Sequence, residues 1–198
     1  MERNGWRQVI NRYFRAIALL LLICLLPGVA CAEYVGSTPD NGVYLVQSQA
    51  HTCTLISATM MLRNYAYMKD NFYEHVTESA VRSNGWNNLG LLWDFNVGSV
   101  NVQVSHDIRT VADKKQYLID RLTEHKEGIV IYDANAPHAI YLFGYDEETD
   151  IFYCADTTTD VAGKAIPLVF SILPGESQEE KIATLDRIWY VAPHGTGI

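Results

Sequence analysis

From Gly128 onward the chain consists of short apolar runs with a period of two, and this pattern most constrains its fold. The runs are rich in β-branched and aromatic residues and are separated by turn-forming residues. They are Ile129–Tyr132, His138–Tyr145, Ile151–Ala155, Ala165–Phe170 and Ile188–Val191. A two-residue period places alternate side chains on opposite faces of a strand. The last third of the chain therefore predicts an antiparallel sheet.

The preceding residues show helical periodicity instead, with apolar side chains recurring at three- and four-residue spacing. The predicted helices are a central one that begins at Cys53 and ends near Arg63, then Phe72–Ser83 and Val111–His125. Residues 33–42 are rich in turn-forming residues and precede a short β-prone run, Val43–Val46. Residues 84–105 predict irregular or weakly β structure. Helices followed by strands predict a single α+β domain over residues 33–198.

The first 32 residues have the composition of a targeting segment. Four arginines precede the apolar run Ala16–Leu26, and the small-residue sequence Ala30-Cys31-Ala32 follows it. This order predicts a secretory signal peptide with cleavage after Ala32, because the run is shorter than the ~20 residues of a membrane span. An uncleaved N-terminal membrane anchor and a lipid-modified Cys31 are the alternatives. All three place the domain outside the cytoplasm, either secreted or anchored.

The charge of the domain restricts its partners. Removing residues 1–32 takes away four of the 15 basic residues and one of the 23 acidic ones, which leaves a net charge of −11. Such a surface repels nucleic acid and anionic membranes. We therefore expect no nucleic-acid partner, and membrane attachment only through an uncleaved N-terminal segment. A peptide or protein substrate is compatible with this charge.

Cys53 begins the central predicted helix and is the candidate nucleophile. Thr52 precedes it as the predicted N-cap, whose hydroxyl would accept a hydrogen bond from a first-turn amide. A cysteine attacks as the thiolate, and helix N-terminal amides with a nearby imidazolium lower a thiol pKa from ~8.5 to about 3.5–7.5. Gln47 lies six residues upstream, and its side-chain amide and the Cys53 N–H are candidate donors to an oxyanion. Gln49, two residues further on, makes the choice of Gln47 an open one.

The hairpin formed by residues 138–156 supplies the other two candidates, a base and a group that orients it. A turn centred on Glu147 places residues whose numbers sum to 294 opposite each other, so that His138 faces Asp156 and Ile140 faces Cys154. Opposed side chains have Cβ atoms ~4.5–5.5 Å apart, which is hydrogen-bonding range for an imidazole and a carboxylate. An imidazole base with an orienting carboxylate completes a Cys-His-Asp triad.

Together these residues resemble the papain-like cysteine peptidases, and within them the C39-like group. The resemblance rests on Gln47 before Cys53, on the strand His138-Ala-Ile-Tyr-Leu-Phe-Gly-Tyr-Asp146, and on Tyr153-Cys-Ala-Asp156. It covers residues 43–192 and implies a papain-like fold, in which a nucleophile helix packs on a C-terminal antiparallel sheet. It implies that Cys53 is the nucleophile, His138 the general base and acid, Asp156 the orienting group and Gln47 the oxyanion donor.

The chain departs from the family pattern at two positions. Thr54 follows the cysteine where the family usually has glycine, and Thr157 follows the aspartate where it often has proline. A bulkier residue beside the nucleophile narrows access to it, which bears on the substrate class.

A Cys53–Cys154 disulfide is the competing interpretation, because an oxidising compartment favours it and because Cys154 shares a strand face with Asp156 in the predicted hairpin. The resemblance instead implies that Cys154 is a small core residue.

The predicted function is an exported cysteine hydrolase that cleaves peptide bonds through a thioester intermediate. A cell-wall amidase or an acyl transferase on the same fold is the alternative, as is a non-catalytic exported binding domain in which Cys53 is oxidised or inert. The sequence contains no CxxC, HExxH, GxGxxG or Walker-type motif, so we expect no metal and no nucleotide cofactor.

Overall fold

The computed structural model describes residues 33–84, 86, 95–97, 100–105, 107–158 and 163–192. The predicted targeting segment lies outside these residues. The described helices are α2 (Cys53–Asp70), α3 (Glu78–Asn84), α4 (Lys114–Glu124) and α5 (Gln178–Thr184). The strands are β1 (Tyr34–Gly36), β2 (Phe95–Val97), β3 (Val100–Ser105), β4 (Ile129–Asp133), β5 (His138–Asp146), β6 (Ile151–Ala155), β7 (Ile166–Pro167) and β8 (Arg187–Ala192). Among these described helices, not one combines the length and apolarity needed to cross a membrane.

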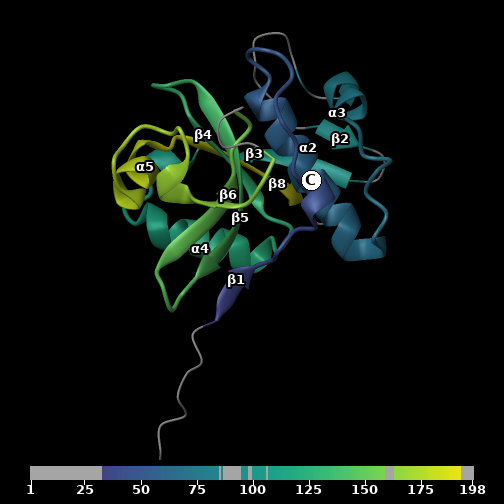
Figure 1. Cartoon of the computed structure of the whole chain (residues 1–198). Coiled ribbons are helices and arrows are strands. Elements are labelled where there is room, and N and C mark those ends of the chain that lie inside the picture. The colour runs from purple at the N-terminus through teal and green to yellow at the C-terminus, as the bar shows by residue number, and fades with distance from the viewer. Residues whose placement is uncertain are drawn as a thin grey trace, which may run out of the picture. The chain divides into compact units, whose positions relative to one another are not determined.

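The strands form one antiparallel sheet, so the α+β class predicted from the sequence is confirmed. Its order is β2-β3-β8-β4-β5-β6-β7, and β1 pairs with the far end of β5. Strand β8 lies between β3 and β4, although residues 106–186 separate it from β3 in the sequence. Helices α2 and α3 lie on one side of the sheet and α4 and α5 on the other (Figure 1).

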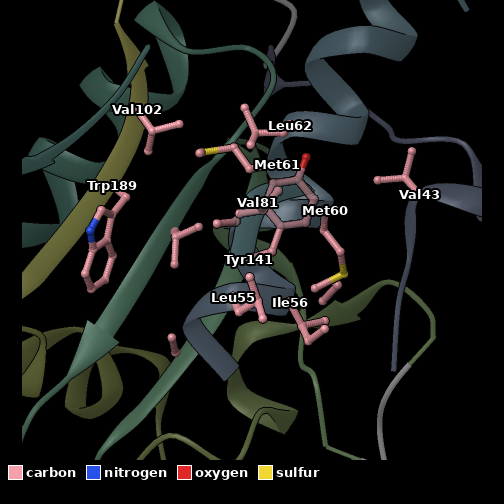
Figure 2. Close-up of a cluster of buried hydrophobic side chains, with 14 of the residues drawn as sticks. Val43, Leu55, Ile56, Met60, Met61, Leu62, Val81, Val102, Tyr141 and Trp189 are labelled. Atoms are coloured by element: carbon pink, nitrogen blue, oxygen red, sulfur yellow. The ribbon is translucent and has the colours of Figure 1, made fainter. Parts of the chain in front are cut away.

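The two faces of the sheet carry two separate apolar clusters, and the period-two pattern of β5 feeds both. Ala139, Tyr141 and Phe143 belong to the cluster on the α2 side. Ile140 and Leu142 belong to the cluster on the α4 and α5 side. Figure 2 shows how the first turns of α2 pack against the sheet in the first cluster, near Tyr141. Burial of both faces explains why nearly every residue of β5 is apolar.

Helix α2 is buried more completely than its sequence predicts. An amphipathic pattern predicts one wide apolar face, but all ten residues from Cys53 to Leu62 are buried. The sheet covers one side of the helix, while Val43 and Val81 cover part of the other. The buried hydroxyl of Ser57 in this helix is hydrogen-bonded, because it donates to the Ala139 carbonyl of β5 at 3.3 Å. The helix is therefore held rigidly from its first residue onward.

Several predicted elements have different bounds in the structure. Val43–Val46 is not a strand; a 3₁₀ turn covers Asn41–Val43. The predicted lead at residues 33–42 contains strand β1, which pairs with β5. Only Glu78–Asn84 is helical in the predicted helix Phe72–Ser83, and the predicted run Ala165–Phe170 contracts to the two residues of β7 followed by a 3₁₀ turn.

Candidate active site

Cys53 is the first residue of α2, at the end of the helix where backbone N–H groups point outward. The first intrahelical bond runs from the Ile56 amide to the Thr52 carbonyl at 2.9 Å, so the amides of residues 53–55 precede the helical ladder. These amides, with the positive end of the helix dipole, favour negative charge at this point. Cys53 is buried, with 8% of the residue exposed.

Thr52 occupies the N-cap position, but the predicted capping bond is wrong. Its hydroxyl donates to the Gln49 carbonyl at 2.8 Å instead of accepting from a first-turn amide. The preceding residue, His51, has a φ of 64°, which turns the loop sharply into the helix. A side chain held in this region of backbone space is strained, and such strain concentrates at functional sites. The cap hydroxyl thus fixes the loop and does not block the helix N-terminus.

His138 lies at the start of β5 and contacts both of its predicted partners. Its Nε2 is 2.9 Å from Oδ1 of Asp156, and its ring also hydrogen-bonds the Cys53 side chain. Because Asp156 engages Nε2, the bond to Cys53 uses Nδ1. Burial lowers the pKa of His138, but the hydrogen bonds to Asp156 and Cys53 together outweigh burial and raise it to about 9. His138 is therefore an imidazolium at neutral pH.

Asp156 follows β6 directly and is fully buried. Oδ1 accepts from His138 and from the amide and hydroxyl of Thr158, each of the latter at 3.2 Å. Oδ2 accepts from the Ile172 amide at 2.9 Å. Burial raises the pKa of Asp156, but the bonds from His138, Ile172 and Thr158 together hold it below its usual value. The carboxylate is thus ionised and fixed in orientation beneath the imidazole.

The strand register that led to this pair was wrong, although the pair itself forms. The turn is closed by Asp146 opposite Ile151, and a bulge between Leu142 and Gly144 shifts the ladder, so Leu142 and not Ile140 faces Cys154. The bulge lies where Tyr34 crosses β5: a Cβ on Gly144 would stand 1.9 Å from the Tyr34 hydroxyl. On the His138 side of the bulge the sum shifts from 294 to 296, which is an even change, so the side chains there keep their predicted faces. His138 then reaches Asp156 diagonally.

Gln47 is placed beside the triad through Thr157. Its backbone amide donates to the Thr157 carbonyl at 2.9 Å, and its Oε1 accepts from the Thr157 hydroxyl at 3.1 Å. Its Nε2 donates to the Gln49 carbonyl at 2.6 Å. A carbonyl only accepts, so this contact fixes the amide with its nitrogen toward the loop before Cys53. The second N–H of Nε2 remains as the candidate oxyanion donor.

Cys154 is a buried free thiol, as is Cys53. Cys53 belongs to the apolar cluster on the α2 face of the sheet, whereas Cys154 belongs to the cluster on the α4 and α5 face. The sheet thus separates them, so the structure contains two independent thiols and not the Cys53–Cys154 disulfide that the sequence left open. Burial and the nearby Asp156 raise the pKa of Cys154 well above its usual value, while Lys181 opposes this.

Two further positions were not identified as contributors from the sequence. Thr157, a departure from the family pattern, orients Gln47. Thr54, the other departure, is fully buried and accepts a hydrogen bond from the Trp86 indole at 3.1 Å. Threonine after the nucleophile therefore anchors the Trp86 ring. No sequence motif marks either contact, because each joins segments far apart in the chain.

A groove of about 250 Å³ adjoins the triad; it is lined by Gln47, Ser48, Gln49, Ala50 and Thr158. It therefore runs between the loop that precedes Cys53 and the segment that follows Asp156. Within the described part of the chain, no cluster of three or more histidine, cysteine or acidic side chains could hold a metal ion. A scan against protein-family models, a search of curated proteins and a search of solved structures each found no match.

Proposed function

We propose that this chain is an exported cysteine hydrolase of papain-like fold that cleaves peptide bonds. The observation that carries the proposal is the chain of contacts from Asp156 Oδ1 to His138 Nε2 at 2.9 Å, and from the His138 ring to Cys53 at the N-terminus of α2. A nucleophile, a base and an orienting carboxylate in this order activate a thiol for attack on a carbonyl. The signal-like segment at residues 1–32 supports export.

In the proposed mechanism the Cys53 sulfur attacks the amide carbonyl as the thiolate, and a carbon–sulfur bond forms. His138, with a pKa of about 9, already holds its proton at neutral pH. It donates that proton to the departing amine as the carbon–nitrogen bond breaks. Water, deprotonated by His138, then attacks the thioester, releasing the acid and returning the proton to the imidazole. Asp156 keeps the ring in place throughout.

The oxyanion formed in each half-reaction requires donors that are fixed before the reaction begins. The Cys53 amide and the Nε2 of Gln47 fill this role in the proposal. Thr157 holds Gln47 through two hydrogen bonds, so little rearrangement is needed when charge develops. In the proposal the substrate enters through the groove beside Gln47 and Thr158.

A peptide-library cleavage assay on the purified protein tests the proposal. We expect cleavage at defined peptide bonds that is abolished by Cys53→Ser. The matched control is Cys154→Ser, which changes the other buried thiol on the opposite face of the sheet and leaves cleavage intact. Mass spectrometry of the acid-quenched reaction detects the acyl group on Cys53. Cleavage that persists in Cys53→Ser, or that is lost equally in both variants, contradicts the proposal.

A further inference from the structure

The buried lysine of α5 has no part in the mechanism above. Lys181 is 97% buried, and its Nζ donates to two backbone carbonyls, those of Ser171 at 3.0 Å and of Leu173. Burying an ammonium group is costly unless its hydrogen bonds are satisfied. A methionine of similar length fills such a space without this cost. The presence of lysine at this position therefore calls for a role.

The two carbonyls that Lys181 binds flank one residue, Ile172. The amide of Ile172 donates to Oδ2 of Asp156 at 2.9 Å. Lys181 thus holds both sides of the peptide segment whose N–H fixes the catalytic carboxylate. Leu168 and Leu173 anchor the same segment in the core, while the Ile172 side chain itself is 53% exposed. The exposed side chain contributes little anchoring, so the segment depends on its neighbours and on Lys181.

We infer that Lys181 is a positioning residue for the Asp156 carboxylate. It acts through the segment 171–173 and sets the orientation of Asp156, and through it the orientation of the His138 imidazole. The inference rests on the proposed function, because it assigns Lys181 a part in that same site. The positive charge of Lys181 also interacts electrostatically with Asp156, Cys154 and Glu180. This charge favours the ionised form of the Asp156 carboxylate.

A double-mutant cycle tests this inference, with iodoacetamide alkylation of Cys53 as the rate that is measured. We expect Lys181→Met to slow alkylation about tenfold in the wild-type background, in the range measured for directly coupled residues. In the Asp156→Asn background the same substitution should change the rate less than twofold, since the carboxylate it positions is gone. Lys181→Arg keeps the charge and the donors and should restore most of the rate.

Lys114 provides a matched control. Its Nζ also donates to two backbone carbonyls, those of Ala183 and Leu185, each at 2.6 Å, at the C-terminal end of α5 and not in the segment 171–173. Lys114→Met should therefore leave the alkylation rate unchanged in both backgrounds. Equal slowing by Lys181→Met in both backgrounds, or no slowing in either, overturns the inference. If Asp156→Asn alone leaves alkylation unchanged, the proposed triad fails instead.

Hydrogen exchange in the wild-type protein gives a second measurement that needs no lysine variant. The Ile172 amide should exchange at least about tenfold more slowly than in Asp156→Asn, because the carboxylate accepts from it. This slow exchange should persist at neutral pH. An Ile172 amide that exchanges at the rate of an open loop in the wild-type protein overturns the inference, even where Lys181→Met fails to fold.

Discussion

The pKa of His138 makes a quantitative prediction about the stability of the folded protein. The pKa rises from 6.5 to about 9 on folding, which corresponds to about 3 kcal/mol of stabilisation of the charged form. His138 is 8% exposed, so solvent screening reduces this figure little. Because the folded pKa is raised, the stabilisation is complete below pH 6.5 and is lost as the pH rises through 9.

Urea denaturation of the wild-type protein and of His138→Gln, each at pH 6 and at pH 10, measures this effect. The glutamine keeps a hydrogen-bond donor near Asp156 but cannot titrate. The free energy of unfolding should fall between the two pH values by about 3 kcal/mol more in the wild-type protein than in the variant. Groups that titrate in both proteins and do not interact with His138 cancel in this difference. Cys53→Ala should shrink the difference without removing it, because Asp156 remains.

Equal pH dependence of the wild-type protein and His138→Gln would refute the reasoning. It would mean that His138 has the same pKa in the folded and unfolded states, so that the bonds to Asp156 and Cys53 only offset the effect of burial and do not outweigh it. A difference of the opposite sign, with the wild-type protein gaining stability toward pH 10, would show that burial outweighs the hydrogen bonds to Asp156 and Cys53.

Three further predictions concern the thiols, the oxyanion donor and the core. At pH 7.5 iodoacetamide should modify Cys53 at least about tenfold faster than Cys154, which is fully buried and has a raised pKa; equal labelling of the folded protein, measured by peptide mass spectrometry, would contradict the assignment. Gln47→Ala should lower kcat about 100-fold with little change in KM, as expected for an oxyanion donor, whereas a change confined to KM would point to substrate binding. Trp189→Ala should lower the free energy of unfolding by about 3–5 kcal/mol, because the side chain is fully buried in the cluster shown in Figure 2; a loss below 1 kcal/mol in urea denaturation would contradict this.

Patterns local to one segment were predictable from the sequence. The strand Ile151–Ala155 has the bounds that its period-two pattern predicts, and α2 begins at Cys53 as expected. One local signal was overlooked. Ser177 and Glu180 have the spacing of a capping box, and the Ser177 hydroxyl does accept from the Glu180 amide at 3.1 Å at the start of α5. This spacing alone predicts the helix.

Contacts between distant segments were not predictable in the same way. Tyr34, more than a hundred residues earlier, packs against Gly144 beside the bulge in β5, and the register of the hairpin does not follow from its turn alone. The bond from the Ile172 amide to Asp156 uses a backbone group that every residue but proline possesses. A side-chain pattern cannot reveal it. The candidate triad was predictable because, near His138, the sum of the paired residue numbers differs from the predicted one by two. An even difference leaves each side chain there on its predicted face of the sheet.

The position of β8 has a consequence for the order in which the chain can acquire its structure. Strand β8 is an interior strand of the sheet and pairs with both β3 and β4. Until residues 187–192 have been synthesised, β3 and β4 each present an unpaired strand edge, and neither half of the sheet is complete. Pairing over such sequence separations also slows folding. In a nascent chain of this protein, the edges of β3 and β4 therefore stay unpaired, and accessible to chaperones, until β8 has been added.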